Sequence, residues 1–223
     1  MLGVSEIFCS IQGEGSHTGV PCVFVRLARC NLRCGYCDTP YSFGAGESVN
    51  HDTLMERIHS YGVPTVCVTG GEPMLHGEHV VELMQTMVDQ QMTVLLETNG
   101  TIPLDDVPQD VIRIMDIKTP GALEIDADDL KFQKKHLHKP NLSLLLPHDE
   151  VKFVVTGRKD YEWARDFVRE HNLSEQVAHV LFSPSWADVN PQDLADWILA
   201  DRLDARLNIQ IHKYIWGPDV QGV

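Results

Sequence analysis

The sequence contains no apolar run of about 18 residues, the length that a transmembrane helix requires. The N-terminal segment Met1–Ser10 has neither a basic region nor a long apolar stretch, so we expect no signal peptide and a cytoplasmic protein. Blocks of lysine and arginine are also missing, and the formal net charge is −14. Because a phosphate backbone would repel such a chain, we expect a small-molecule substrate, and neither direct nucleic-acid binding nor a membrane partner.

Internal repeats, low-complexity stretches and long linkers are absent as well, which predicts a single domain over residues 1–223. Short apolar runs alternate with segments in which apolar residues recur at helical spacing. This alternation predicts an α/β fold with a mainly parallel sheet, either open or closed into part of a barrel. We expect strands at Cys22–Ala28, Pro64–Val68, Met92–Leu96, Val111–Met115, Val151–Val155, Val177–Phe182 and Arg206–Ile211. We expect helices at Asp52–Tyr61, Gly77–Gln90, Asp160–His171 and Asn190–Ala200, with Asp52 and Asn190 as N-caps.

Nearly every predicted strand runs directly into unusual polar residues. The segments are Arg29–Cys30, Thr69-Gly70-Gly71-Glu72-Pro73, Glu97–Gly100, Asp116–Lys118, Ser183–Ser185 and His212–Tyr214. The carboxyl ends of parallel strands gather on one face of a sheet, and active sites lie on that face. We therefore expect these segments to meet around one cavity, because ordinary βα turns would explain only one or two of them.

Three of the six cysteines form a C-x3-C-x2-C motif, at Cys30, Cys34 and Cys37, in the loop after the first predicted strand. The others, Cys9, Cys22 and Cys67, are scattered in apolar surroundings, which is typical of packed side chains. Thiolates suit iron–sulfur clusters and zinc, and three of them leave one iron of a cubane open for an outside ligand. A zinc site completed by a distant cysteine or histidine stays an alternative.

The motif C-x3-C-x-aromatic-C resembles the signature of the radical S-adenosylmethionine superfamily, and Thr69–Pro73 resembles that superfamily's GGE motif. The resemblance implies a [4Fe–4S] cluster on the three cysteines, with S-adenosylmethionine chelating the open iron. The backbone of the GGE motif would hold the methionyl amino group, and Tyr36 would lie near the adenine. An electron from a donor such as flavodoxin or ferredoxin would release a 5′-deoxyadenosyl radical, which abstracts a hydrogen atom.

Further segments resemble the 7-carboxy-7-deazaguanine synthases, namely Glu6–Gly15, Gly19–Pro21, Val23–Leu27, Cys37–Thr39 and Gln210–Tyr214. This resemblance implies a partial (β/α) barrel, which is a reduced radical S-adenosylmethionine core, and a homodimer. The implied reaction converts 6-carboxy-5,6,7,8-tetrahydropterin into 7-carboxy-7-deazaguanine with loss of ammonia, for the synthesis of queuosine in transfer RNA. A Mg²⁺ ion would bind beside the substrate carboxylate.

The same resemblance implies roles for individual residues. Substrate contacts are implied for Ile11, Gln12, Gly13, Arg26, Thr69 and His212. Cofactor contacts are implied for Tyr36, Gly71, Glu72, Asp116, Ile117, Lys118, Ser183, Pro184, Ser185 and Trp186. Thr39 is the implied magnesium ligand, although Asp38 is the better ligand by residue type alone. No residue is assigned as an acid or base, and Arg26 has the chemistry for a bidentate pair with the substrate carboxylate.

Two features depart from that family. Many relatives carry Ser-Pro-Lys where this chain has Asp116-Ile117-Lys118, which leaves the role of Asp116 open. The segment Ile215–Val223 extends past the His-Lys-Tyr motif, so no substrate contact is assigned to the C-terminus. Two other functions stay open: a small radical enzyme such as a glycyl-radical activase, and a zinc-stabilised binding module without catalysis.

Overall fold

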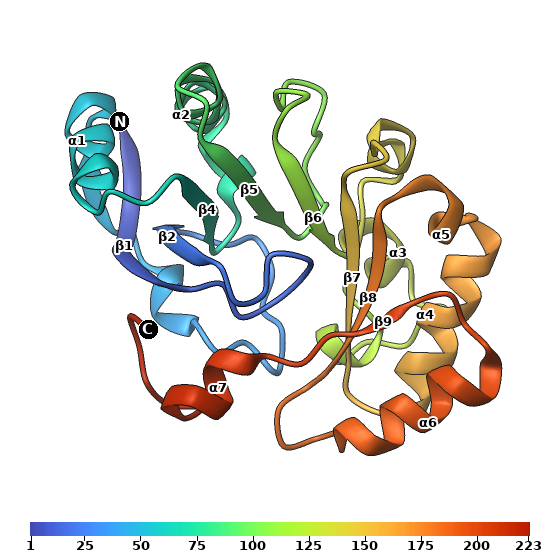
Figure 1. Ribbon diagram of the computed structural model, residues 1–223. Helices are drawn as coiled ribbons and strands as arrows, with labels where there is room; N and C mark the ends of the chain where they lie inside the picture. The colour runs from blue at the N-terminus through green and yellow to red at the C-terminus, as the bar shows by residue number, and fades with distance from the viewer.

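In the computed structural model, which describes residues 1–223, nine strands form one curved sheet in the order β3-β1-β2-β4-β5-β6-β7-β8-β9 (Figure 1). From β2 to β9 all neighbouring strands pair in parallel, whereas β1 is antiparallel to both β2 and β3. The predicted partial barrel of mainly parallel strands is therefore confirmed. The strands are β1 (Leu2–Ile11), β2 (Pro21–Leu27), β3 (Glu47–Val49), β4 (Thr65–Gly70), β5 (Thr93–Thr98), β6 (Ile112–Asp116), β7 (Glu150–Val155), β8 (His179–Pro184) and β9 (Arg206–Leu207).

The α-helices lie mainly outside the curve of the sheet, where Figure 1 shows α1, α2, α4 and α6, while α7 crosses the open side. They are α1 (His51–Ser60), α2 (Glu78–Asp89), α3 (Leu130–Lys135), α4 (Arg158–Glu170), α5 (Leu173–Gln176), α6 (Pro191–Asp201) and α7 (Ile211–Trp216). In α2 the buried residues Val80, Leu83, Met84 and Met87 recur three and four positions apart. That spacing gives the helix one apolar face, which packs against the strands.

Three expectations about the elements need correction. The N-cap of α1 is Asn50, whose side chain accepts a hydrogen bond from the Thr53 N–H at 2.8 Å, so Asp52 lies inside the first turn. The run Arg206–Ile211 is a strand only at its first two residues, because Ile211 already begins α7. The long first strand β1 was not predicted, since polar residues interrupt its apolar pattern. The N-cap Asn190 is confirmed by the hydrogen bond that it accepts from the Gln192 N–H.

Alternation along the strands separates the outer core from the inside of the barrel. Side chains that point outward, such as Val25, Val68 and Phe153, belong to the large core shared with the helices. Inward side chains near the start of β2, β4, β5 and β6 form a small apolar floor of Cys22, Phe24, Cys67, Leu95 and Ile114. Further along, toward the carboxyl ends, the inward positions turn polar: Arg26 on β2, Thr69 on β4, Glu97 on β5, Asp116 on β6 and Lys152 on β7. This polar layer above the floor positions the site.

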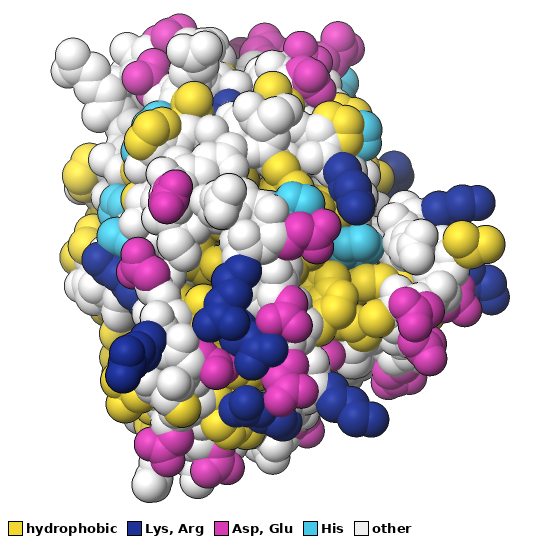
Figure 2. Space-filling view, turned by 90° about the vertical axis from the view of Figure 1, so that its right-hand side faces the viewer, with side chains coloured by type: hydrophobic (Ala, Val, Ile, Leu, Met, Phe, Trp, Pro, Cys, Tyr) yellow, Lys and Arg dark blue, Asp and Glu magenta, His cyan; other side chains and the backbone are white.

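The helical side of the molecule offers no continuous basic surface. Figure 2, which views the face over α4, α5 and α6, shows Lys and Arg side chains interleaved with Asp and Glu. Arg165 pairs with Asp166 and Asp201 there, and Arg158 pairs with Glu162. None of the helices has the length and hydropathy that crossing a bilayer requires.

Candidate active site

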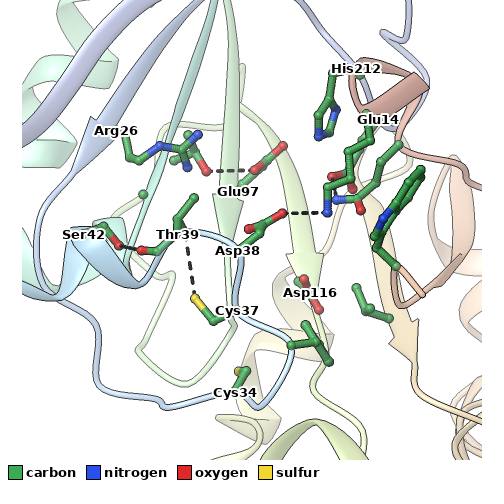
Figure 3. A pocket seen from close by; sticks show the side chains of 18 of the residues that line it. Glu14, Arg26, Cys34, Cys37, Asp38, Thr39, Ser42, Glu97, Asp116 and His212 are labelled. Atoms are coloured by element: carbon green, nitrogen blue, oxygen red, sulfur yellow. Dashed lines mark hydrogen bonds and ion pairs between the residues drawn. The ribbon is translucent and has the colours of Figure 1, made fainter. Parts of the chain in front are cut away.

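A cavity of about 670 Å³ opens at the carboxyl ends of the strands. It brings together polar segments that are far apart in the sequence, as expected. Of the predicted site residues, the cavity is lined by Ile11, Gln12, Gly13, Arg26, Cys30, Cys34, Tyr36, Cys37, Thr39, Thr69, Gly71, Asp116, Lys118, Ser185, Trp186 and His212. In the view of Figure 3, Arg26, Glu97, Glu14 and His212 surround its upper part and Cys34 and Cys37 its lower part.

The three cysteines of the motif are free, half-buried thiols on one side of this cavity. Burial raises the pKa of Cys34 to about 11 and also raises that of Cys30, while the nearby Lys118 ammonium acts in the opposite direction. Metal binding requires thiolates, and a cation beside Cys34 favours that form. No group of three His, Cys, Asp or Glu side chains converges closely enough to hold a single ion. The three thiols thus share the cavity wall without forming a ligand set for one ion.

The glycines of the GGE motif pack directly against the backbone that enters the cysteine loop. The Gly71 N–H donates to the Leu27 carbonyl at 3.0 Å, and the Glu72 N–H donates to the Arg29 carbonyl at 2.8 Å. A Cβ added at Gly71 would overlap the Arg29 carbonyl and lie 3.0 Å from the Cys30 Cβ. Only glycine allows this approach, so the motif fixes the cysteine loop at its first ligand and leaves exposed backbone beside it.

The Glu72 side chain turns away from the cavity and organises the loop after β5. Its carboxylate accepts hydrogen bonds from Met74 N–H at 3.0 Å, Thr98 Oγ1 at 2.8 Å and Asn99 N–H at 2.7 Å. Asn99 in turn donates from Nδ2 to Asn31 Oδ1 at 3.0 Å, inside the cysteine motif. Glu72 therefore connects the GGE motif to the loop after β5 and, through Asn99, to the cysteine motif.

On the other side of the cysteine loop, the end of β6 presents Asp116 and Lys118. Asp116 Oδ2 lies 2.8 Å from Lys118 Nζ, which also donates to the Tyr36 hydroxyl at 3.4 Å. Burial alone would lower the pKa of Lys118, but Asp116 raises it well above its usual value, so the ammonium is charged. The second oxygen, Oδ1 of Asp116, is buried without any hydrogen-bond partner. Such an oxygen suits a ligand that donates a hydroxyl or amino proton.

The loop from Gln12 to Gly15 closes the open side of the barrel beside α7. Gln12 is 2% exposed, and its Nε2 has no hydrogen-bond partner, so the cavity wall contains an unpaired donor. A Cβ at Gly13 would overlap the His212 ring, and the Gly13 carbonyl accepts from the Ile211 N–H at 3.1 Å. Burial lowers the pKa of His212, which favours a neutral imidazole next to this donor.

Arg26 reaches the cavity from β2 with part of its guanidinium free. Its Nε donates to Glu6 Oε1 at 2.7 Å, and the Tyr41 hydroxyl donates to the same oxygen. The two terminal nitrogens make no hydrogen bond to the protein, which leaves a planar pair of donors for a carboxylate. On the neighbouring strands, Thr69 Oγ1 donates to Glu97 Oε2 at 2.8 Å.

The segment after the last cysteine places Thr39 and Asp38 differently. The Asp38 carboxylate pairs with Lys213 Nζ of α7 at 3.0 Å and is 48% exposed. The Thr39 hydroxyl has only the Cys37 sulfur as a neighbour, at 3.9 Å, and faces the cavity. A hydroxyl without a strong partner is available to an ion, whereas the carboxylate already has a cation.

Four predicted contacts lie outside the cavity wall: Glu72, Ile117, Ser183 and Pro184. Ile117 points into the outer core, and Ser183 accepts a hydrogen bond from Asn208 Nδ2. Conversely, sequence reasoning assigned no role to Glu14, Glu97, Lys152 and Lys213, which line the cavity. The segments that contain Glu97 and Lys213 were expected at the cavity, and the inward alternation of β7 is the signal that could have identified Lys152. The C-terminal residues 218–223 also line the cavity, and nothing in their sequence indicated it.

Comparison with known proteins gives a consistent result. The family model described as the radical SAM superfamily matches residues 25–182. The 7-carboxy-7-deazaguanine synthase of Koribacter versatilis (strain Ellin345) is 42% identical over 235 residues and is covered, like this chain, over 100% of its length. The 7-carboxy-7-deazaguanine synthase of Chlorobaculum tepidum is 40% identical over 225 residues, which cover 100% of this chain and 97% of the relative.

Among solved structures, QueE from Escherichia coli has a TM-score of 0.67 at 22% identity, covering 94% of this chain and 93% of its own. Streptococcus suis SuiB bound to the precursor peptide SuiA has a TM-score of 0.56 at 13% identity, covering 83% of this chain and 47% of its own. At these identities the likeness concerns the fold.

Proposed function

Because this chain belongs to the radical S-adenosylmethionine superfamily and, within it, to the 7-carboxy-7-deazaguanine synthases, we propose that its cavity carries out the ring contraction of 6-carboxy-5,6,7,8-tetrahydropterin. The product is 7-carboxy-7-deazaguanine, and ammonia leaves. The activity is that of a lyase in queuosine biosynthesis. A [4Fe–4S] cluster and S-adenosylmethionine are the cofactors of the superfamily.

One observation carries the proposal: a single cavity combines the three cysteines with a set of free donors suited to a carboxylated heterocycle. The donors are the two terminal nitrogens of Arg26 and Nε2 of Gln12. A flat pterin edge rich in acceptors would satisfy the buried amide, and its carboxylate would pair with the guanidinium. In Figure 3, Arg26 and His212 both lie above the cysteines.

The chain's own residues hold the two ligands and shield them. Cys30, Cys34 and Cys37 would ligate the cluster, and the backbone around Gly71 would hold the methionyl end of the cofactor. When bound, the cluster supplies the electron that cleaves S-adenosylmethionine, and the cleaved cofactor supplies the radical that takes a hydrogen atom from the substrate. Oδ1 of Asp116, buried and unpartnered, would accept a hydrogen bond from the cofactor. The neutral imidazole of His212 would hydrogen-bond the pterin without adding charge.

The direct test uses anaerobic protein with reconstituted cluster, S-adenosylmethionine, a reductant, Mg²⁺ and the carboxypterin. We expect 7-carboxy-7-deazaguanine and ammonia, identified by mass spectrometry. Arg26→Met should weaken binding of the carboxypterin by about 10- to 100-fold, the range for a lost hydrogen bond to a charged group. A tetrahydropterin without the 6-carboxylate is the matched control, since wild type and Arg26→Met should bind it with the same affinity. A fully loaded enzyme that forms no deazaguanine would refute the proposal.

We also propose that Thr39 helps to hold a Mg²⁺ ion against the substrate carboxylate. The free Thr39 hydroxyl supports this, because Mg²⁺ keeps most of its waters and takes few protein ligands. Thr39→Val should raise the Mg²⁺ concentration needed for half-maximal rate. If Asp38→Asn alters that concentration and Thr39→Val does not, the assignment to Thr39 is wrong and Asp38 is the ligand.

We propose that two copies of the chain form a homodimer. Residues 1–223 of each copy form one domain in this proposal. Large apolar side chains at Leu199, Tyr214 and Ile215 are 73%, 59% and 55% exposed, and a second copy would cover such residues. Flavodoxin or ferredoxin is the proposed electron donor. Sedimentation at micromolar concentration tests the assembly, and a single species of about 25 kDa would refute it.

A further inference from the structure

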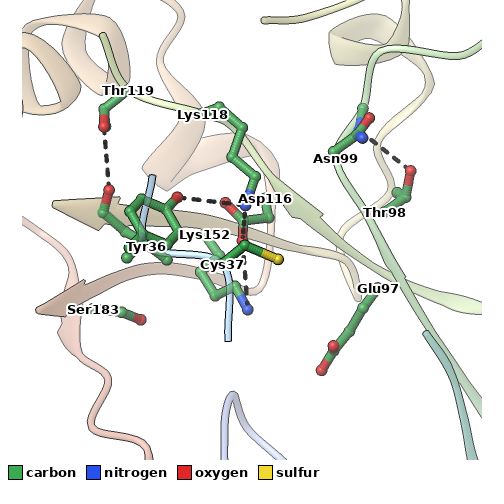
Figure 4. Close-up of polar contacts among 12 residues, drawn as sticks. Tyr36, Cys37, Glu97, Thr98, Asn99, Asp116, Lys118, Thr119, Lys152 and Ser183 are labelled. Atoms are coloured by element: carbon green, nitrogen blue, oxygen red, sulfur yellow. Dashed lines mark hydrogen bonds and ion pairs between the residues drawn. The ribbon is translucent and has the colours of Figure 1, made fainter. Parts of the chain in front are cut away.

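Four charged side chains of alternating sign cross the inside of the barrel, between the Gln12–Gly15 loop and the cysteine loop. Lys152 Nζ lies 2.9 Å from Glu14 Oε2 and 3.6 Å from Asp116 Oδ2. That Asp116 oxygen lies 2.8 Å from Lys118 Nζ, and Lys118 donates onward to the Tyr36 hydroxyl. Figure 4 shows Asp116 between the two lysines. Formal charges along the row sum to zero.

Lys152 is the residue in this row that spans two different segments of the site. It lies on β7 directly opposite Asp116 of β6 in the parallel register, so both side chains point inward at neighbouring positions. Its side chain is 8% exposed, and its ion-pair partners are the two carboxylates of Glu14 and Asp116. Burial alone would lower the pKa of Lys152, but Glu14 raises it well above its usual value, which keeps the ammonium charged.

On one side of Lys152, Glu14 fixes the segments assigned to the pterin. Its carboxylate accepts hydrogen bonds from Gln210 Nε2 at 2.8 Å and from Asn208 Nδ2 at 3.4 Å, just before α7. Glu14 follows Gln12 and Gly13 in the same loop, and α7 carries His212. Lys152 holds the Glu14 carboxylate, and Glu14 connects the Gln12–Gly15 loop to the segment before α7. Lys152 therefore fixes both segments on the pterin side.

On the other side, Asp116 fixes the segment assigned to the cofactor. Both lysines approach its Oδ2, which leaves Oδ1 turned away from them, buried and without a partner. Lys118 contacts Asp116 and also donates to the Tyr36 hydroxyl, so a change in the position of Asp116 would move the cysteine loop. The Lys152 ammonium thus contacts Glu14 on the pterin side and Asp116 on the cofactor side.

We propose that Lys152 is a positioning residue that sets the pterin side of the cavity relative to the cofactor side by holding Glu14 and Asp116 together. The inference rests on the proposed function. Hydrogen abstraction needs reacting atoms about 3–3.5 Å apart, and a displacement of about 1 Å lowers rates on the order of 100-fold. Without Lys152 the two carboxylates share a single cation, Lys118, and repel each other, so the two sides should separate.

The test compares Lys152→Met with the double variant K152M/D116S, both with reconstituted cluster. In K152M the row carries a net charge of −1, and removal of the Asp116 carboxylate restores zero. We expect K152M to lower deazaguanine formation by about 100-fold, while cofactor cleavage continues and yields 5′-deoxyadenosine without product. Because Asp116 would also contact the cofactor, D116S alone should lower the rate, and we expect the double variant to lose about tenfold less than the product of the two single losses, a usual coupling for contacting groups. With wild type, K152M and the double variant, D116S alone completes a double-mutant cycle.

Arg113→Met is the matched control for loss of a buried cation. Arg113 lies on β6, next to β7, and is 4% exposed, but it faces away from the cavity and pairs with Asp149. It should lower the melting temperature and leave the ratio of 5′-deoxyadenosine to product unchanged. If R113M raises that ratio as K152M does, the effect is general loosening and the proposal is wrong.

Two other results would overturn the proposal. One is a K152M enzyme with wild-type product ratio. The other is a rise in the pterin KM that D116S does not relieve, which would mean that the ammonium binds the substrate directly. Failure of the proposed function is distinguishable, because the wild-type enzyme would then form no deazaguanine. In that event, the coupling between positions 152 and 116 is measured from S-adenosylmethionine binding to the same four proteins, and additive effects would refute it.

Discussion

Replacing Gly71 by alanine should damage the site far more than its single methyl group suggests. The added Cβ would overlap the Arg29 carbonyl, a backbone atom that cannot swing aside, and would also press on Cys30. Overpacking of this kind costs about 1–3 kcal/mol of unfolding free energy. The shift also strains the hydrogen bonds that the Leu27 and Arg29 carbonyls accept, at about 0.5–1.5 kcal/mol each. We therefore expect a loss of about 2–6 kcal/mol.

Because the displaced atoms adjoin the first cluster ligand, the rate per loaded cluster should fall by about 100-fold. The assay measures iron and sulfide content, the rate of deazaguanine formation per cluster, and urea unfolding. Gly157→Ala is the matched control, since a Cβ at Gly157 meets nothing within 4 Å and its extended backbone admits any residue. That control should stay within about 1 kcal/mol of wild type. If the two variants are equally active and equally stable, the close approach of Gly71 is not what holds the cysteine loop.

Three further outcomes are expected. Cys34→Ala should abolish both the visible absorbance of the anaerobic cluster and turnover, whereas the exposed Cys9→Ser should retain both; turnover in C34A would overturn the ligand assignment. Asp149→Ala leaves Arg113 buried without its charge partner and should cost about 3–5 kcal/mol in urea unfolding, with normal rate per cluster at permissive temperature. Burial holds the pKa of His136 below 6.5, so the unfolded chain binds more protons and the free energy of unfolding should fall as the pH drops below 6.5. His136→Phe should flatten that pH dependence between about pH 7.5 and 5.5, and an unchanged slope would exclude His136 as a contributor.

The layered interior explains how a small chain holds two ligands. The apolar floor, which includes Phe24, Leu95 and Ile114, closes the barrel below the site. Polar side chains line the layer above it, among them the ion pair of Lys152 with Asp116 and the hydrogen bond of Thr69 to Glu97. Because buried polar atoms usually have hydrogen-bond partners, we expect ligands to complete the hydrogen bonding of Nε2 of Gln12 and Oδ1 of Asp116.

Local spacing in the sequence was enough to predict the fold class and much of the site. The period of the apolar residues separates strands from helices, and parallel strands bring their carboxyl ends to one edge whatever the details of packing. For that reason the order of residues alone predicts that the cysteine motif, the glycines at 70–71 and His212 surround one cavity, as they do. Resemblance to a family then supplied the chemistry.

Contacts that depend on register and side-chain direction were decided only by the tertiary structure. Residue type favoured Asp38 as an ion ligand, yet Lys213, distant in sequence, engages it and leaves Thr39 free. Glu72 lies in a recognised motif, but the turn after β4 directs its side chain into the protein, where it accepts a hydrogen bond from the Asn99 N–H. The alternation of β7 points Lys152 inward, but only the pairing of β6 with β7 places it opposite Asp116. Pairing between strands is a long-range property, so neither composition nor periodicity within one segment contains it.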